Sequence, residues 1–125
     1  MKWYSVSYGF EGRLVLDVVI DGGAEVSLEK IRRILKRHEK ELKEKFKVKE
    51  IGVFGSYVRG EQRERSDVDI LVDFYGTPTF FEFVELENYL SEVLGVKVDL
   101  VMKRALKPKI REGVLKEVAY IWREL

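Results

Sequence analysis

At residues 51–74 the chain reads IGVFGSYVRGEQRERSDVDILVDF. One apolar segment ends at a Gly55-Ser56 turn, and the next begins with two alternate carboxylates, Asp67 and Asp69. Side chains of a strand alternate between its faces, so both carboxylates point the same way. Two like charges side by side on a half-buried strand are costly unless a cation neutralises them. The pattern therefore predicts a divalent metal ion near a phosphate-binding turn, which indicates an enzyme that handles nucleotides.

The Gly55-Ser56 turn is suited to an anion. Glycine lets the backbone approach a phosphate closely, and the helical turn expected after it presents free amides and the positive end of its dipole. The Ser56 hydroxyl adds a further donor. Taken alone, a Gly-Ser pair after a strand is more often an ordinary turn.

A third carboxylate strengthens the metal prediction. Asp99 lies in a mostly apolar segment, VKVDLV at residues 96–101, on the opposite face from its apolar neighbours. If this strand lies beside the one with Asp67 and Asp69, three carboxylates converge. They could hold two Mg²⁺ ions about 3.5–4 Å apart, one activating a nucleophilic oxygen and one steadying the leaving pyrophosphate. Without Asp99, two solvated aspartates at a strand end would explain the sequence about as well.

Hydrophobic periodicity predicts an α+β fold, with one sheet and helices packed against it. A β-hairpin comes first, and helices then alternate with strands. The predicted hairpin covers 3–20, the strands cover 48–54, 67–74 and 96–102, and the helices cover 28–46, 57–61, 80–94 and 108–125. Gly113 predicts an irregularity in the last helix.

Composition restricts the class of protein. A chain of 125 residues, 46% hydrophobic and 36% charged, is expected to form one globular domain. It has no apolar run long enough for a membrane helix, no signal-peptide core near its start and no cysteine. These features predict a cytoplasmic protein without membrane contact. The net charge of +1 gives no field for long nucleic acids, so direct nucleic-acid binding is not expected.

Three other charged residues, Asp73, Lys103 and Arg104, lie on or just after the predicted strands. Asp73 shares a strand face with Asp69 but lies further along, so we expect a solvated charge at the strand end. Lys103 and Arg104 follow the strand that carries Asp99 and could approach a triphosphate or a partner.

Residues 51–74 resemble the active-site signature of the DNA polymerase beta-type nucleotidyltransferase superfamily. That signature is Gly-Ser, ten residues, then Asp-x-Asp, which is the spacing found here. Arg59-Gly60, and Ser66 just before the aspartates, narrow the resemblance to the minimal nucleotidyltransferases, or MNT proteins. The tail LKPKIREGVLKE at 106–117 also resembles the usual end of that family. The resemblance covers roughly residues 25–125.

The resemblance implies a small mixed β-sheet flanked by helices, and it assigns roles to the residues above. Gly55 and Ser56 would bind the triphosphate of ATP. Asp67 and Asp69 would coordinate Mg²⁺. Asp99 matches the third carboxylate, which joins the metal site and helps to activate the acceptor hydroxyl.

Arg59 has three expected roles under the resemblance: it could contact phosphate, contact the partner, or pair with a neighbouring carboxylate. The last of these is structural, and we regard it as at least as good an explanation as a catalytic role.

The resemblance also suggests an acceptor. Larger members of the superfamily carry a further domain that grips tRNA, DNA or an aminoglycoside, whereas only 30 residues follow Gly95 here. The acceptor must therefore bind largely outside this chain. Minimal members occur with a helical HEPN partner, a toxic ribonuclease, and transfer AMP from ATP to a tyrosine hydroxyl of that partner. The expected function is thus that of a protein adenylyltransferase antitoxin.

Two alternatives stay open. The chain could mask its toxin by binding alone, although the full set of aspartates and the serine argues against a decayed site. It could also be a small-molecule nucleotidyltransferase of the antibiotic-modifying type, although the missing acceptor domain argues against that.

Residues 1–24 lie outside the resemblance and are expected to form an N-terminal β-hairpin extension to a nucleotidyltransferase domain over 25–125. Leu14, Leu16, Val18 and Ile20 would share one face of the hairpin. Such a face needs a surface to bury against, so we expect the hairpin to dock on the domain or to form a homodimer.

Overall fold

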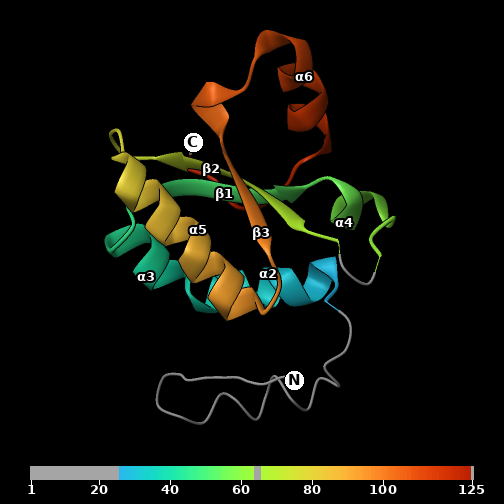
Figure 1. The fold of residues 1–125 in the computed structure, drawn as a ribbon, viewed down its shortest axis with the longest axis horizontal. Coiled ribbons are helices and arrows are strands. Elements are labelled where there is room, and N and C mark those ends of the chain that lie inside the picture. The colour runs from blue at the N-terminus through green and yellow to red at the C-terminus, as the bar shows by residue number, and fades with distance from the viewer. Residues whose placement is uncertain (1–25, 64–65, 125) are drawn as a thin grey trace, which may run out of the picture.

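The computed structural model describes residues 26–63 and 66–124. Four strands form one mixed sheet in the order β3-β2-β1-β4. Figure 1 shows α2, α3 and α5 on one face of this sheet and α6 on the opposite side. The elements are α2 (Leu28–Arg37), α3 (Glu39–Glu44), β1 (Val48–Phe54), α4 (Ser56–Arg59), β2 (Val68–Phe74), α5 (Phe80–Leu94), β3 (Val98–Met102), the 3₁₀ turn η2 (Lys103–Ala105), α6 (Pro108–Glu117) and β4 (Ala119–Trp122). The expected small mixed sheet flanked by helices is confirmed.

The pairing of the strands brings the carboxylates together. β1 and β2 run antiparallel, whereas β2 and β3 run parallel. A parallel pair needs a long crossover connection, and α5 supplies it. In the register of this pair Asp69 lies opposite Asp99. The strand carrying Asp99 is therefore the neighbour that the sequence required.

The hydrophobic core lies between the sheet and the helices α2, α3 and α5. Ile31 and Leu35 from α2, and Leu86 and Leu90 from α5, are fully buried together with strand residues such as Ile70. Each such side chain contributes roughly 1.5–3 kcal/mol when it leaves water. This packing uses one face of the sheet and leaves the other face, which carries Asp69, for the site.

α5 keeps its predicted bounds because both of its ends carry specific signals. Thr79 Oγ1 accepts from the Glu82 N–H at 3.1 Å, and Glu82 Oε1 accepts from the Thr79 N–H at 2.8 Å, which is a capping box. Gly95 ends the helix with a φ of 71°, a value that costs glycine little. The 28–46 helix is less regular than predicted, because it divides at His38 into α2 and α3.

The C-terminal segment corrects a prediction. Instead of a helix reaching Leu125 with an irregularity at Gly113, α6 runs unbroken to Glu117, and Ala119–Trp122 forms β4 on the outer edge of β1. Without β4 that edge would expose unpaired backbone groups, which favours the strand over more helix. Gly52 permits the close approach, because a Cβ there would lie 2.6 Å from Val118 Cγ2.

The predicted N-terminal hairpin lies outside the described residues. Within the described ranges, no helix has the length and apolar character needed to cross a membrane.

Candidate active site

The Gly55-Ser56 turn joins β1 to α4 and lies against Asp69. Gly55 has φ 83° and ψ −153°, a backbone region that favours glycine. A Cβ at this position would clash with Asp69 Oδ2. Glycine is therefore required twice, by the backbone conformation and by the carboxylate packed beside it.

The three predicted carboxylates gather at one end of the β2–β3 pair. Asp69 is half-buried opposite Asp99, and Asp67 immediately precedes β2. Burial, followed by the negative charges of Asp99 and Asp67, raises the pKa of Asp69, and Arg59 acts in the other direction. A cation placed among these groups would relieve this repulsion.

The carboxylate oxygens of these three aspartates suit Mg²⁺ as ligands. Carboxylate oxygens are ligands that this ion prefers, together with water and phosphate oxygens. Across residues 26–63 and 66–124, no three histidine, cysteine, aspartate or glutamate side chains form a ready-made metal cluster. An ion held by these aspartates would therefore take part of its coordination from phosphate and water, as Mg²⁺ usually does at nucleotide sites.

Glu117 reaches the turn from the end of α6. It lies in the tail that resembles the family, but the sequence pattern assigns it no role at the site. Its Oε2 accepts from the Gly55 N–H at 2.6 Å, and its Oε1 accepts from Arg59 Nη1 at 2.8 Å. Burial acts to raise the pKa of Glu117, but these two donors outweigh it and lower the pKa. Glu117 thus ties α6 to a turn that lies 62 residues away in the sequence.

Arg59 pairs with carboxylates, which is one of the three roles expected for it. Besides Glu117, it donates from Nε to Glu61 Oε1 at 2.9 Å. Glu61, and after it Glu117, raise the pKa of Arg59. The Arg59 side chain is still 48% exposed, so a phosphate at the turn could reach it.

The other end of the sheet holds ion pairs that serve the fold. Asp73, expected to be solvated, pairs with Arg104 at 3.0 Å, and Arg104 also donates to the Phe74 carbonyl at 2.9 Å. Lys103 Nζ lies 2.7 Å from Glu50 Oε2, and the Glu50 side chain is only 6% exposed. Lys103 and Arg104 are therefore engaged within the domain.

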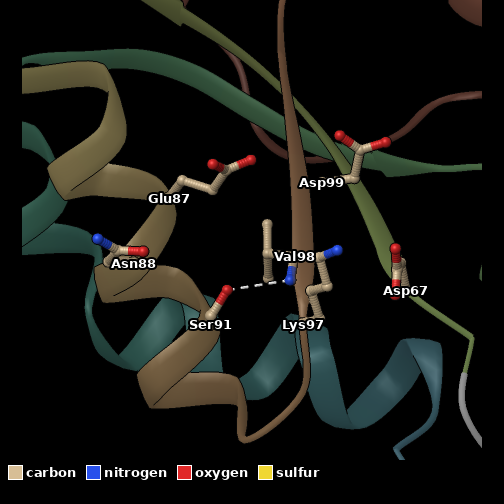
Figure 2. Close-up of a pocket in the computed structure, with 7 residues that line it drawn as sticks. All are labelled: Asp67, Glu87, Asn88, Ser91, Lys97, Val98 and Asp99. Atoms are coloured by element: carbon tan, nitrogen blue, oxygen red, sulfur yellow. Dashed lines mark hydrogen bonds between the residues drawn. The ribbon is translucent and has the colours of Figure 1, made fainter. Parts of the chain in front are cut away.

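A pocket adjoins the carboxylates beside β3, and Figure 2 shows its lining. Its volume is about 420 Å³. β3 and the residues around it contribute one wall, and α5 contributes the other. The lining residues are Asp67, Glu87, Asn88, Ser91, Lys97, Val98 and Asp99.

Comparison with known families agrees with this geometry. A model described as a nucleotidyltransferase domain matches residues 35–121. This chain belongs to the nucleotidyltransferase domain family. This chain is 59% identical over 98 residues to the protein adenylyltransferase MntA of Thermococcus cleftensis. The match covers 78% of this chain and 99% of that protein.

Two solved structures resemble the structure of this chain. One is assigned as a minimal nucleotidyltransferase, with a TM-score of 0.67 and 38% identity over 78% of this chain and 98% of that one. The other is a toxin–antitoxin crystal structure with AMP-PNP, with a TM-score of 0.62 and 29% identity over 75% of this chain and 73% of that one. The fold seen here is thus that of the minimal members of the family.

Proposed function

We propose that this nucleotidyltransferase is an antitoxin that transfers AMP from ATP to a tyrosine hydroxyl of a HEPN ribonuclease toxin. The observation that carries the proposal is the contact of the Gly55 turn with Asp69, with Asp99 opposite on the next strand. A phosphate-binding turn beside paired carboxylates provides the positioning and the charge stabilisation that phosphoryl transfer requires. The similarity to a protein adenylyltransferase and to a toxin–antitoxin structure with AMP-PNP supports the acceptor class and the nucleotide.

The chain's own residues would divide the work as follows. Ser56 binds the triphosphate, and Arg59 contributes its exposed guanidinium. A phosphate at the turn also competes with Glu117 for the Gly55 N–H. Asp67, Asp69 and Asp99 would hold the two Mg²⁺ ions, which would supply positive charge to stabilise the phosphates.

The transfer itself is a substitution at the α-phosphorus of ATP. The acceptor oxygen forms a bond to that phosphorus, and the bond to the leaving pyrophosphate breaks. The hydroxyl proton passes to a nearby carboxylate base. We assign this role to Asp99, because its strand β3 lies on the side of β2 away from the turn.

Mass measurement of the toxin tests the proposal. The chain, the HEPN toxin, ATP and Mg²⁺ are mixed, and the intact toxin is weighed while its ribonuclease activity is followed. We expect the toxin to gain at least one AMP mass, pyrophosphate to be released and ribonuclease activity to fall. A toxin of unchanged mass that keeps its ribonuclease activity would reject the proposal.

A paired variant separates catalysis from masking by binding. Asp67→Ala combined with Asp69→Ala removes two of the three carboxylates and should abolish transfer and neutralisation together. Asp73→Ala is the matched control, because it removes a carboxylate from the same strand at the end that pairs with Arg104. Neutralisation that survives the double substitution would mean that the toxin is masked and not modified.

A further inference from the structure

We propose that the pocket between β3 and α5 receives the hydroxyl-bearing segment of the acceptor protein, and that this segment is basic. The inference rests on the proposed adenylyl transfer and extends it by naming where the acceptor lies. The pocket shares Asp67 and Asp99 with the carboxylate group and adds Asn88 and Lys97, which are exposed side chains.

The position of the pocket relative to the phosphate-binding turn is the first step. In the order β3-β2-β1-β4, the turn follows β1 on one side of β2, and the pocket borders β3 on the other side. In nucleotidyl transfer the entering and leaving oxygens stand roughly in line on opposite sides of the phosphorus. If pyrophosphate leaves at Gly55-Ser56, the acceptor hydroxyl enters from the side of Asp99, where the pocket opens.

The outer edge of β3 limits how the acceptor can be held. The Val98 N–H donates to Ser91 Oγ at 3.0 Å, drawn as a dashed line in Figure 2, and the Leu100 N–H donates to Glu87 Oε2 at 3.0 Å. An added strand would need these outward amides for its own pairing. Because α5 already occupies them, the acceptor cannot extend the sheet, and side chains must recognise it.

The charge of α5 selects the kind of segment. Residues 80–94 contain no lysine or arginine, although the chain as a whole has a net charge of +1. Of the glutamates of this helix, only Glu87 lines the pocket, where Asp67 and Asp99 add two further carboxylates and Lys97 adds one positive charge. The lining is therefore negative on balance. Charge complementarity therefore favours a tyrosine flanked by lysine or arginine and disfavours a nucleic-acid acceptor. The acidic residues of α5 are Glu82, Glu85, Glu87 and Glu92.

Substitutions that place a positive or a negative charge at residue 88, in the pocket lining, test the inference. Asn88→Lys and Asn88→Glu place side chains of similar size at an exposed helix site, so neither is expected to unfold the domain. Phe81→Lys is the control, because it adds the same charge to the same helix at an 82% exposed position outside the pocket. The measurements are KM for the toxin, KM for ATP, and the affinity of the toxin complex without ATP.

We expect Asn88→Lys to raise KM for the toxin and to weaken the complex about fivefold, the effect of one exposed charge contact. Asn88→Glu should leave both values unchanged or improve them, and KM for ATP should stay the same in all three variants. Equal effects of Asn88→Lys and Asn88→Glu, or of Asn88→Lys and Phe81→Lys, would overturn the inference, as would no effect of Asn88→Lys. A wild-type chain that binds the toxin but transfers no AMP would reject the proposed function alone, since the complex affinities still report on the pocket.

Discussion

The negative charge of Asp69 destabilises the metal-free protein. The proposed metal binding explains why a carboxylate is nevertheless found there. Asp69 is half-buried, close to two other carboxylates, and these surroundings raise its pKa. Asp69→Asn removes one of the repelling charges and keeps the shape of the side chain. We expect the free energy of unfolding of the metal-free protein to rise by about 1 kcal/mol or less, while AMP transfer is lost.

Thermal unfolding with and without Mg²⁺ checks this expectation. The wild-type melting temperature should rise as Mg²⁺ is added, because a ligand that binds only the folded state stabilises it. The melting temperature of Asp69→Asn should respond much less. Asp73→Asn, which breaks an ion pair with Arg104, should be slightly destabilised and keep the Mg²⁺ response. A destabilised Asp69→Asn protein would show that the carboxylates do not repel one another.

A second prediction at the scale of one residue concerns the carboxylate of Glu117. Glu117→Gln still accepts a hydrogen bond from the Gly55 N–H but loses one of the two carboxylate charges that pair with Arg59, the other being that of Glu61. We expect about 1 kcal/mol less stability at neutral pH. KM for ATP should fall, because Arg59, held then by Glu61 alone, is freer to move towards the phosphates. Glu112→Gln on the same helix is the control, since its pair with Lys116 is exposed and 3.6 Å long.

The same substitution has a defined pH dependence. Because the pKa of Glu117 is lowered on folding, its charge stabilises the fold above the ordinary glutamate value of 4.5. That stabilisation is lost as the pH falls through the lowered pKa. The stability difference between wild type and Glu117→Gln should therefore shrink in acid, as denaturant unfolding at several pH values will show. A difference that stays constant down to acid pH would mean that the charge of Glu117 contributes nothing.

At the scale of elements, the edge of β1 depends on a single missing side chain. A Cβ at Gly52 would lie 2.6 Å from Val118 Cγ2 and 3.1 Å from the Ala119 carbonyl oxygen. Gly52→Ala should therefore cost about 1–3 kcal/mol, because β4 must shift away from β1. Gly113→Ala is the matched control, because a Cβ added there would have no neighbouring atom within 4 Å outside its own turn of helix, and in a helix interior alanine gains up to about 1 kcal/mol. Equal melting temperatures for the two variants would contradict this account of β4.

The elements that the sequence predicted well are those with local signals at both ends. α5 is an example, because Thr79, Glu82 and Gly95 mark its limits within the segment itself. The strand at Ala119–Trp122 was missed for the opposite reason. Its apolar residues fit a helix as well as a strand, and the deciding factor is the open edge of β1, far away in the sequence.

The same distinction applies to the candidate site. Asp67, Asp69 and the Gly55-Ser56 turn could be found because they lie close together in one stretch with a fixed spacing. Glu117 could not be found, because its contact with Gly55 exists only once α6 has folded back across the sheet. Long-range contacts between charged residues leave no periodic pattern, so sequence reasoning has no signal for them.

At the scale of the whole molecule, the open question is what residues 1–25 contribute to the domain. The described residues, 26–63 and 66–124, include a buried hydrophobic core and the three carboxylates. A chain beginning at Gly23 should therefore fold, bind ATP and transfer AMP at close to the full rate, as thermal unfolding and the toxin mass assay will measure. The N-terminal segment should act on assembly or stability and not on chemistry.

Analytical ultracentrifugation assigns that contribution. If the apolar face of the predicted hairpin joins two protomers, the full chain sediments as a dimer and the shortened chain as a monomer. If the face docks on its own domain, the mass per particle stays monomeric and the melting temperature of the shortened chain falls, because buried apolar surface is returned to water. Unchanged mass and unchanged stability would refute both roles, and loss of AMP transfer in a folded shortened chain would place the segment at the active site instead.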